Sequence, residues 1–173
     1  MTNVRADLVA LRARAAADER HIYEMGSDGL KTIRPAGDPE RSLVLSRLTV
    51  WLLSNGFGAD RVVINCGIET GGAARVPDLT VWAPGRPPRS AGSGYATTDG
   101  LMLTVDVATA SSAITDVDSR AAEYALAGIP RYWLVRADGL VCRHTLTDSG
   151  EYGLVAAGPV PLDQLLAVPP EIL

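Results

Sequence analysis

The sequence predicts an α/β fold with a mixed β-sheet, because two apolar runs lie on either side of a helix-like segment. Residues 101–107 (LMLTVDV) form the first run, and the helix-like segment after it continues to about Ala127. Gly128 ends that segment, and the second apolar run begins at Tyr132. Strand, crossover helix and strand make a parallel βαβ unit, whose strands are buried on both faces. An acid inside a buried strand is costly unless it binds something, so Asp106 is the first candidate functional residue.

Two helices and a hairpin are predicted before this unit. Apolar residues recur at helical spacing over residues 4–18, which predicts an amphipathic helix. A turn signal at Ser27-Asp28-Gly29 divides residues 21–33 and predicts a small hairpin. Asp38-Pro39-Glu40 combines a capping acid with a first-turn proline and begins a second helix, which Asn55-Gly56 ends.

Strand patterns dominate the rest of the chain. Strands are predicted over residues 61–66, 76–82, 140–147 and 151–156. A short final helix is predicted over residues 160–166. A segment rich in Pro, Gly and Ser, residues 84–100, is longer than ordinary connections, which predicts a mobile loop or a lid. With 173 residues, the chain is expected to form one domain over residues 1–173.

Composition argues against several classes of protein. With a net charge of −4 and a pI near 5.1, the protein has no general excess of positive charge to attract nucleic acid. A metal-dependent nuclease is still possible, because the bound cation would neutralise its acidic site. Cys66 and Cys142 lack CxxC spacing, which argues against a structural zinc site and fits a reducing cytoplasm. The sequence shows no signal peptide and no run of about 18 apolar residues. We therefore expect a soluble, cytoplasmic protein without a membrane partner.

Asp78 and Asp106 are candidates for a metal site. Asp78 follows a proline at the head of one predicted strand, and Asp106 lies late in the next. If the two strands are neighbours, the acids meet in a cleft at one end of the sheet. Their like charges repel there, and a divalent cation is the usual remedy. Such a cation activates water and stabilises the developing phosphate charge, as phosphodiester hydrolysis requires.

A longer string of residues around these acids resembles a known family. The string comprises Arg75-Val76-Pro77-Asp78-Leu79, Leu103-Thr104-Val105-Asp106-Val107, Asp116, Arg120, Tyr124, Ala127-Gly128-Ile129-Pro130 and Tyr132-Trp133-Leu134-Val135. It resembles the Uma-type family of predicted endonucleases, in the PD-(D/E)XK, restriction-endonuclease-like superfamily, and the likeness runs from about Tyr23-Glu24 to Leu166. The resemblance implies a restriction-endonuclease-like fold and an endonuclease that uses Mg²⁺ or Mn²⁺. The expected partner of such an enzyme is a nucleic-acid substrate, with DNA favoured over RNA. Whether the protein forms a homodimer is left open.

The resemblance also implies roles for single residues. Asp78 matches the first metal-binding acid and Asp106 the second, with the carbonyl of Val107 as a further ligand. Arg120 stands on the crossover helix where the family has its catalytic lysine, and Glu24 would supply a third carboxylate. We therefore expect Arg120 to project into the cleft and to pair with Asp78 or Asp106 when no metal is bound.

Two departures from the family pattern leave alternatives open. Asp106 stands where glutamate is usual, and the guanidinium of Arg120 cannot act as a base. Lys31, in the predicted hairpin, is the only lysine in the chain that could substitute. Asp116 is a candidate helix cap and could instead pair with Arg120 on the helix surface, while Asp106 could be a structural acid that is hydrogen-bonded to backbone amides or paired with an arginine. The alternative function is a catalytically degenerate protein that keeps the fold as an interaction or regulatory module.

Overall fold

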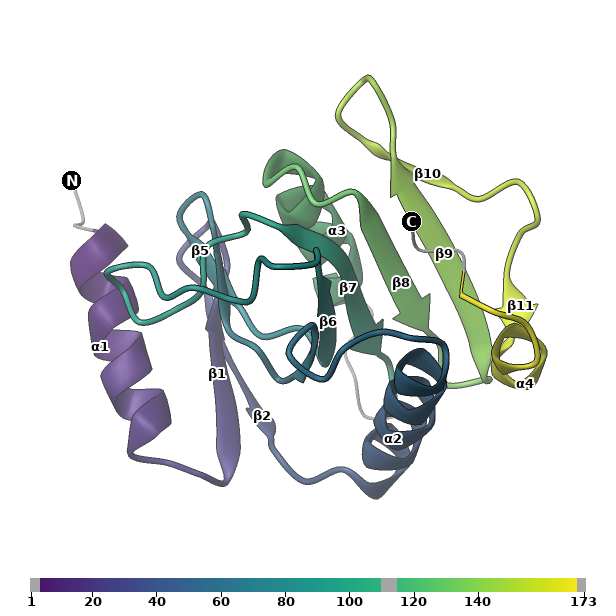
Figure 1. Cartoon of the computed structure of the whole chain (residues 1–173). Helices are drawn as coiled ribbons and strands as arrows, with labels where there is room; N and C mark the ends of the chain where they lie inside the picture. Colours follow the sequence, from purple (N-terminus) through teal and green to yellow (C-terminus); the bar gives the residue numbers. More distant parts are fainter. Residues whose placement is uncertain (1–3, 110–114, 171–173) are drawn as a thin grey trace.

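The computed structural model describes residues 4–109 and 115–170, in which two β-sheets are combined with helices (Figure 1). The larger sheet contains β3 (Val62–Ile64), β6 (Leu79–Trp82), β7 (Leu101–Val107), β8 (Arg131–Val135), β9 (Leu140–Leu146), β10 (Tyr152–Leu154) and β11 (Val160–Pro161). The smaller sheet contains β1 (His21–Met25), β2 (Lys31–Pro35), β4 (Ile68–Thr70) and β5 (Ala73–Arg75). The helices are α1 (Val4–Ala16), α2 (Pro39–Ser54), α3 (Thr115–Leu126) and α4 (Leu162–Leu166). Among the residues described, no helix has both the length and the apolar character needed to cross a membrane.

The larger sheet is mixed and is built around the predicted βαβ unit. Its strand order is β10-β9-β8-β7-β6-β3, with β11 paired to β9. β7 and β8 are parallel, with Leu103 opposite Arg131 and Val107 opposite Val135, and α3 is the crossover between them. The other pairs in this sheet are antiparallel. The α/β fold and the crossover helix are therefore confirmed.

One face of the larger sheet is covered by α2. Asp38 caps this helix by accepting a hydrogen bond from the Arg41 backbone N–H at 3.1 Å, and Pro39 occupies the first turn. The buried side chains of the helix, Leu45, Leu48, Trp51 and Leu52, pack against inward-facing residues of β6, β7 and β8. From its apolar pattern, the sequence predicts that this helix has one buried face made of Leu43, Val44, Leu48, Trp51 and Leu52, but Leu43 is 63% exposed. That one position of the predicted face is wrong, because Leu43 lies on the opposite side of the helix from Leu45 and Leu48.

The other face of the larger sheet is covered by α3 (Figure 1). Tyr124 of this helix packs with Trp82 and Tyr132 of the sheet in a second apolar cluster. Gly128, at a φ of 71°, follows the helix where the sequence predicts its end. The two helices thus enclose the sheet from opposite sides, which buries β7 on both faces.

The hairpin of β4 and β5, which is half of the smaller sheet, was not predicted from the sequence. The sheet order is β2-β1-β5-β4, and Gly71-Gly72 form the turn of the missed hairpin, both with positive φ. A Gly-Gly pair between two short strands is a known hairpin signal. Three-residue strands are too short to show a clear alternation of apolar and polar residues, which explains the omission.

The Pro-, Gly- and Ser-rich segment is anchored at its middle, and the expectation of a mobile loop or lid is wrong there. Tyr95 is buried beside Leu8, Leu11 and Met25. The Ala96 backbone N–H donates to the Gly67 carbonyl, and its own carbonyl accepts from Glu69, both at 2.8 Å. This segment therefore forms part of the packing between α1 and the smaller sheet.

Replacing Leu48 by alanine should destabilise the protein strongly, because the side chain is 1% exposed in the packing between α2 and the larger sheet. We expect a loss of about 2–5 kcal/mol in the free energy of unfolding, measured by urea denaturation. Leu43→Ala on the same helix is the control, with an expected change within about 0.5 kcal/mol. Equal losses in the two variants would contradict the packing of α2.

Candidate functional site

The register of β6 and β7 brings Asp78 and Asp106 together. Leu79 pairs with Val105 in this antiparallel ladder, so Asp78, immediately before β6, lies opposite Asp106. Side chains alternate between the faces of a sheet. Because Leu79 and Val105 pack on the α2 side, the two acids face the side of α3. The start of one strand and the end of its antiparallel neighbour thus supply the pair of carboxylates that the sequence predicts.

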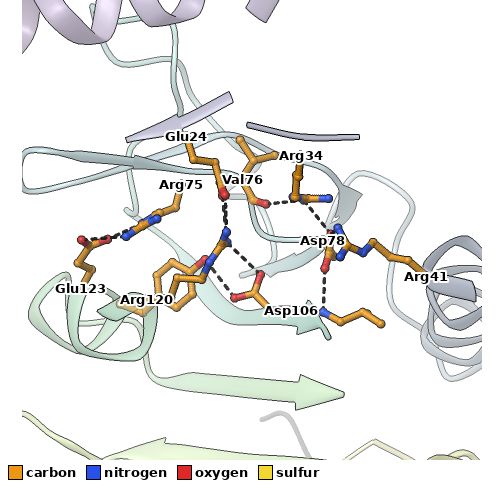
Figure 2. A network of polar contacts seen from close by, with 11 residues as sticks. Glu24, Arg34, Arg41, Arg75, Val76, Asp78, Asp106, Arg120 and Glu123 are labelled. Atoms are coloured by element: carbon orange, nitrogen blue, oxygen red, sulfur yellow. Dashed lines mark hydrogen bonds and ion pairs between the residues drawn. The ribbon is translucent and has the colours of Figure 1, made fainter. Parts of the chain in front are cut away.

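The Asp78 carboxylate is buried and held from two directions. Its Oδ2 accepts a hydrogen bond from the Val107 backbone N–H at 2.7 Å. Its Oδ1 accepts from Arg34 Nη2 at 2.8 Å, and Arg41 Nη1 lies 3.6 Å from the same oxygen. Arg34 comes from β2 of the smaller sheet and Arg41 from the first turn of α2. Asp78 is therefore the point at which these elements meet the larger sheet (Figure 2).

The Asp106 carboxylate lies beside Arg120 and Tyr124, which project from α3. Arg120 Nη1 is 3.6 Å from Asp106 Oδ1, and the Tyr124 hydroxyl is 3.5 Å from Oδ2. Burial raises the pKa of Asp106 to about 6; the Arg120 charge opposes this rise, and the charges of Asp78 and Glu24 add to it. Asp106 is thus an acid whose proton is gained and lost near neutral pH.

Glu24 and Arg120 form a buried ion pair next to these acids. Both terminal nitrogens of Arg120 donate to the two carboxylate oxygens of Glu24, and the Val76 backbone N–H donates to Glu24 Oε1 at 2.6 Å. Glu24 is completely buried. Parallel bonds between a guanidinium and a carboxylate fix both groups in position. Arg120 therefore projects toward the site and forms the expected ion pair with Asp106, but both of its terminal nitrogens donate hydrogen bonds to Glu24.

A second buried ion pair joins α3 to the smaller sheet. Arg75 Nε lies 2.6 Å from Glu123 Oε2, and Glu123 Oε1 also accepts a hydrogen bond from the Ser27 backbone N–H at 2.8 Å. Glu123 follows Arg120 by three residues, so both side chains project from neighbouring turns of one side of the helix. Glu24 of the first pair and Arg75 of the second both come from the smaller sheet, and Figure 2 shows the two pairs side by side.

A cavity of about 790 Å³ opens over the two aspartates. Among the residues described, its lining includes three arginines and four acids: Arg34, Arg41, Arg120, Asp38, Glu40, Asp78 and Asp106. The formal charge of this lining is −1 with all seven groups ionised. A divalent cation would reverse the sign of the charge and make the cavity attractive to an anion.

Of the expected metal ligands, Asp78, Asp106 and Val107 are placed where they could bind a divalent cation, whereas Glu24 is not. Both are oxygen donors on one cavity wall, Val107 lines the same cavity, and the mutual repulsion of the acids contributes to the raised pKa of Asp106. Glu24 does not line the cavity and already accepts hydrogen bonds on both oxygens. Within the described part of the chain, no three His, Cys, Asp or Glu side chains form a ready metal-binding group.

Arg34 and Arg41 were not predicted from the sequence. Lys31 is the cation that the sequence offers from the hairpin, but Lys31 is exposed. Alternation along β2 places Arg34, three residues later, on the less exposed side of the strand. The expected alternative of a surface pair between Asp116 and Arg120 involves a side chain outside the described part of the structure. What the structure does show is Arg120 bound to Glu24.

Comparison with known proteins agrees with this geometry. Residues 7–172 match the model of the family Uma2, described as "Putative restriction endonuclease". The chain belongs to the Uma2 family. A crystal structure from Anabaena variabilis, described as a putative nuclease belonging to DUF820, matches with a TM-score of 0.63 and 16% sequence identity over 84% of this chain and 89% of that one. At this identity the likeness shows the fold alone, which is restriction-endonuclease-like. A search of curated proteins found no match.

Replacing Asp106 by asparagine should stabilise this Uma2 protein at neutral pH. Because the pKa of Asp106 is raised to about 6 in the folded chain, its protonation stabilises the fold fully below about pH 4, and this contribution is lost as the pH rises through 6. Asp106→Asn should therefore increase the free energy of unfolding at pH 7.5 by on the order of 1–3 kcal/mol, with the gain shrinking toward pH 4.

Urea denaturation between pH 3.5 and 8 measures this difference, and Asp99→Asn is the control. Asp99 is an exposed acid paired with Arg86, so its substitution should leave the pH profile unchanged. A lower stability of Asp106→Asn at pH 7.5 would mean that the Arg120 contact outweighs the burial of the charge.

Proposed function

We propose that this Uma2 protein hydrolyses phosphodiester bonds of nucleic acid in a reaction that depends on a divalent cation. The observation that supports this most strongly is the pair of buried aspartates on neighbouring strands at the base of a cavity. The description of the family as restriction endonucleases agrees with it. The proposal takes DNA as the substrate and the cytoplasm as the location, and leaves monomer and homodimer both open.

In this proposal, Asp78 and Asp106 hold Mg²⁺ or Mn²⁺, with the Val107 carbonyl as a further ligand. The bound cation would lower the pKa of a water molecule and stabilise negative charge on the phosphate. The Val107 N–H orients one oxygen of Asp78. Asp106 must lose its proton to bind a cation, and its pKa of about 6 allows this at neutral pH.

Glu24 and Arg120 complete the site in different ways. Arg120 keeps a positive charge beside Asp106 at the position of the family's lysine, but its guanidinium cannot accept a proton from water. Glu24 binds Arg120 by both nitrogens and sets its position. We therefore propose that Arg120 stabilises negative charge at the site through its own positive charge. Glu24 positions Arg120 and does not bind the metal.

A catalytically degenerate protein that uses the fold for interaction is the second candidate. It is favoured by the ion pairing at the site, since Asp78 and Glu24 already have arginine partners. Such a protein would need no cation. Direct measurement of Mn²⁺ binding distinguishes the two candidates, because the hydrolase must bind the ion and the interaction module need not.

Cleavage of nucleic acid should require both aspartates. We expect Mg²⁺- or Mn²⁺-dependent cleavage by the wild type, and a loss of at least about a hundredfold in rate in Asp78→Asn and in Asp106→Asn, because each change removes a charged oxygen ligand. The assay follows labelled DNA and RNA on gels with and without metal, and Asp99→Asn serves as the control. Cleavage that survives Asp106→Asn would place the reaction elsewhere.

Arg120→Lys should increase the cleavage rate while lowering the melting temperature. An ammonium group is a compact charge that suits water alignment, but it cannot form the two parallel bonds to Glu24. Rate and Tm are measured on the same preparation, with Arg136→Lys, in an exposed ion pair with Asp138, as the control. A folded Arg120→Lys variant that is slower than the wild type would show that the guanidinium itself is needed.

A further inference from the structure

Arg34 has more hydrogen-bonding capacity than the protein uses. Its Nη2 donates to Asp78 Oδ1 at 2.8 Å and to the Val76 carbonyl at 3.1 Å. Its Nη1 is buried and, among the residues described, has no hydrogen-bond partner. A buried donor without a partner is costly and needs an explanation. Arg34 lines the cavity over the aspartates, so its side chain borders the space that a ligand would occupy.

Arg120 is less suited than Arg34 to receive a substrate phosphate. Its two terminal nitrogens both donate to Glu24, and Nη1 also lies 3.6 Å from Asp106. Binding a phosphate through those nitrogens would leave Glu24 buried without its counter-charge, which is strongly unfavourable. The cation at the family's lysine position is therefore committed to the protein itself.

Arg34, by contrast, can exchange its partner without leaving a buried charge alone. The side chain is 16% exposed, and its carboxylate partner, Asp78, is one of the two proposed metal ligands. Once Asp78 is bound to a divalent cation, its negative charge is compensated by that cation. Arg41, 3.6 Å from the same Asp78 oxygen, adds a second positive charge at this wall.

We propose that Arg34 pairs with Asp78 in the metal-free protein and contacts a phosphate oxygen of the nucleic-acid substrate once Asp78 holds the cation. This inference rests on the proposed function and adds a substrate-binding residue to it. The planar guanidinium, with several donors in one plane, matches the oxygens of a phosphate. Arg34 would then bind a phosphate whose negative charge the cation would also stabilise.

Arg34→Gln should change two affinities in opposite directions. Removing a positive charge next to Asp78 should tighten Mn²⁺ binding by about threefold to tenfold. Loss of a charge-assisted hydrogen bond should weaken oligonucleotide binding by about tenfold or more. A residue with only a structural role would weaken both or change neither.

The experiment measures the two affinities separately on the full chain. Isothermal titration with Mn²⁺ alone gives the metal affinity. Fluorescence anisotropy of a labelled DNA oligonucleotide, with Ca²⁺ in place of Mg²⁺ to slow cleavage, gives the substrate affinity. Arg86→Gln, which removes the same charge from an exposed ion pair with Asp99, is the matched control and should leave both affinities near the wild type.

The outcomes separate this inference from the proposed function. Tighter Mn²⁺ binding together with weaker oligonucleotide binding in Arg34→Gln supports it. An active wild type with Arg34→Gln equal to Arg86→Gln, or with both affinities weakened, overturns the role of Arg34 alone. A wild type that binds no Mn²⁺ and cleaves nothing overturns both proposals.

Arg34→Lys decides the question if Arg34→Gln does not fold. The lysine keeps the charge but not the planar set of donors, so Mn²⁺ affinity should stay near the wild type while oligonucleotide binding weakens about threefold or more. Wild-type affinity for the oligonucleotide in this variant would overturn the proposal.

Discussion

The pairing of buried carboxylates with arginines connects the two sheets around the site. Glu24 of the smaller sheet binds Arg120 of α3, the helix that covers one face of the larger sheet. Arg34 of the smaller sheet binds Asp78, immediately before β6. Arg75 and Glu123 add a third connection between the smaller sheet and α3. Removing one partner of a buried ion pair leaves an uncompensated charge, which typically costs about 3–5 kcal/mol. The position of the smaller sheet over the aspartates therefore depends on these pairs.

The same pairing links the stability of the fold to the proposed chemistry. A metal site made of acids is unfavourable without its cation, because like charges repel in a buried position. Here Arg34 faces Asp78, and Arg120 lies beside Asp106. A cation that binds these acids competes with one arginine and repels both. In the proposed reaction, metal affinity would therefore depend on the positions of the arginines, and the reverse.

Arginine suits this arrangement better than lysine because one guanidinium can serve two acceptors at once. Arg34 reaches both Asp78 and the Val76 carbonyl, and Arg120 reaches both Glu24 and Asp106. An ammonium group is a point charge and does not offer this planar set of donors. Arginine at position 120 thus gains a structural role through Glu24 in addition to its charge. In the proposed reaction, the phosphate contact would then come from Arg34 rather than from Arg120.

Local patterns in the sequence determined the βαβ unit, the caps of α2 and the presence of acids at the ends of two strands. These features depend on residues close together in the chain, such as Asp38 with Arg41, or on the continuous, largely apolar run of β7. The family resemblance already placed Glu24 and Arg120 near those acids, but only the tertiary structure decided which charges pair and added Arg34 and Arg41 to them. Glu24 and Arg120 are 96 positions apart, and Arg34 and Asp78 are 44 apart, so no spacing rule connects them. The smaller sheet brings them together, and its β4–β5 hairpin has strands too short to reveal themselves by periodicity. The sequence shows which side chains carry charge, and the packing of one sheet against the other determines which charges meet.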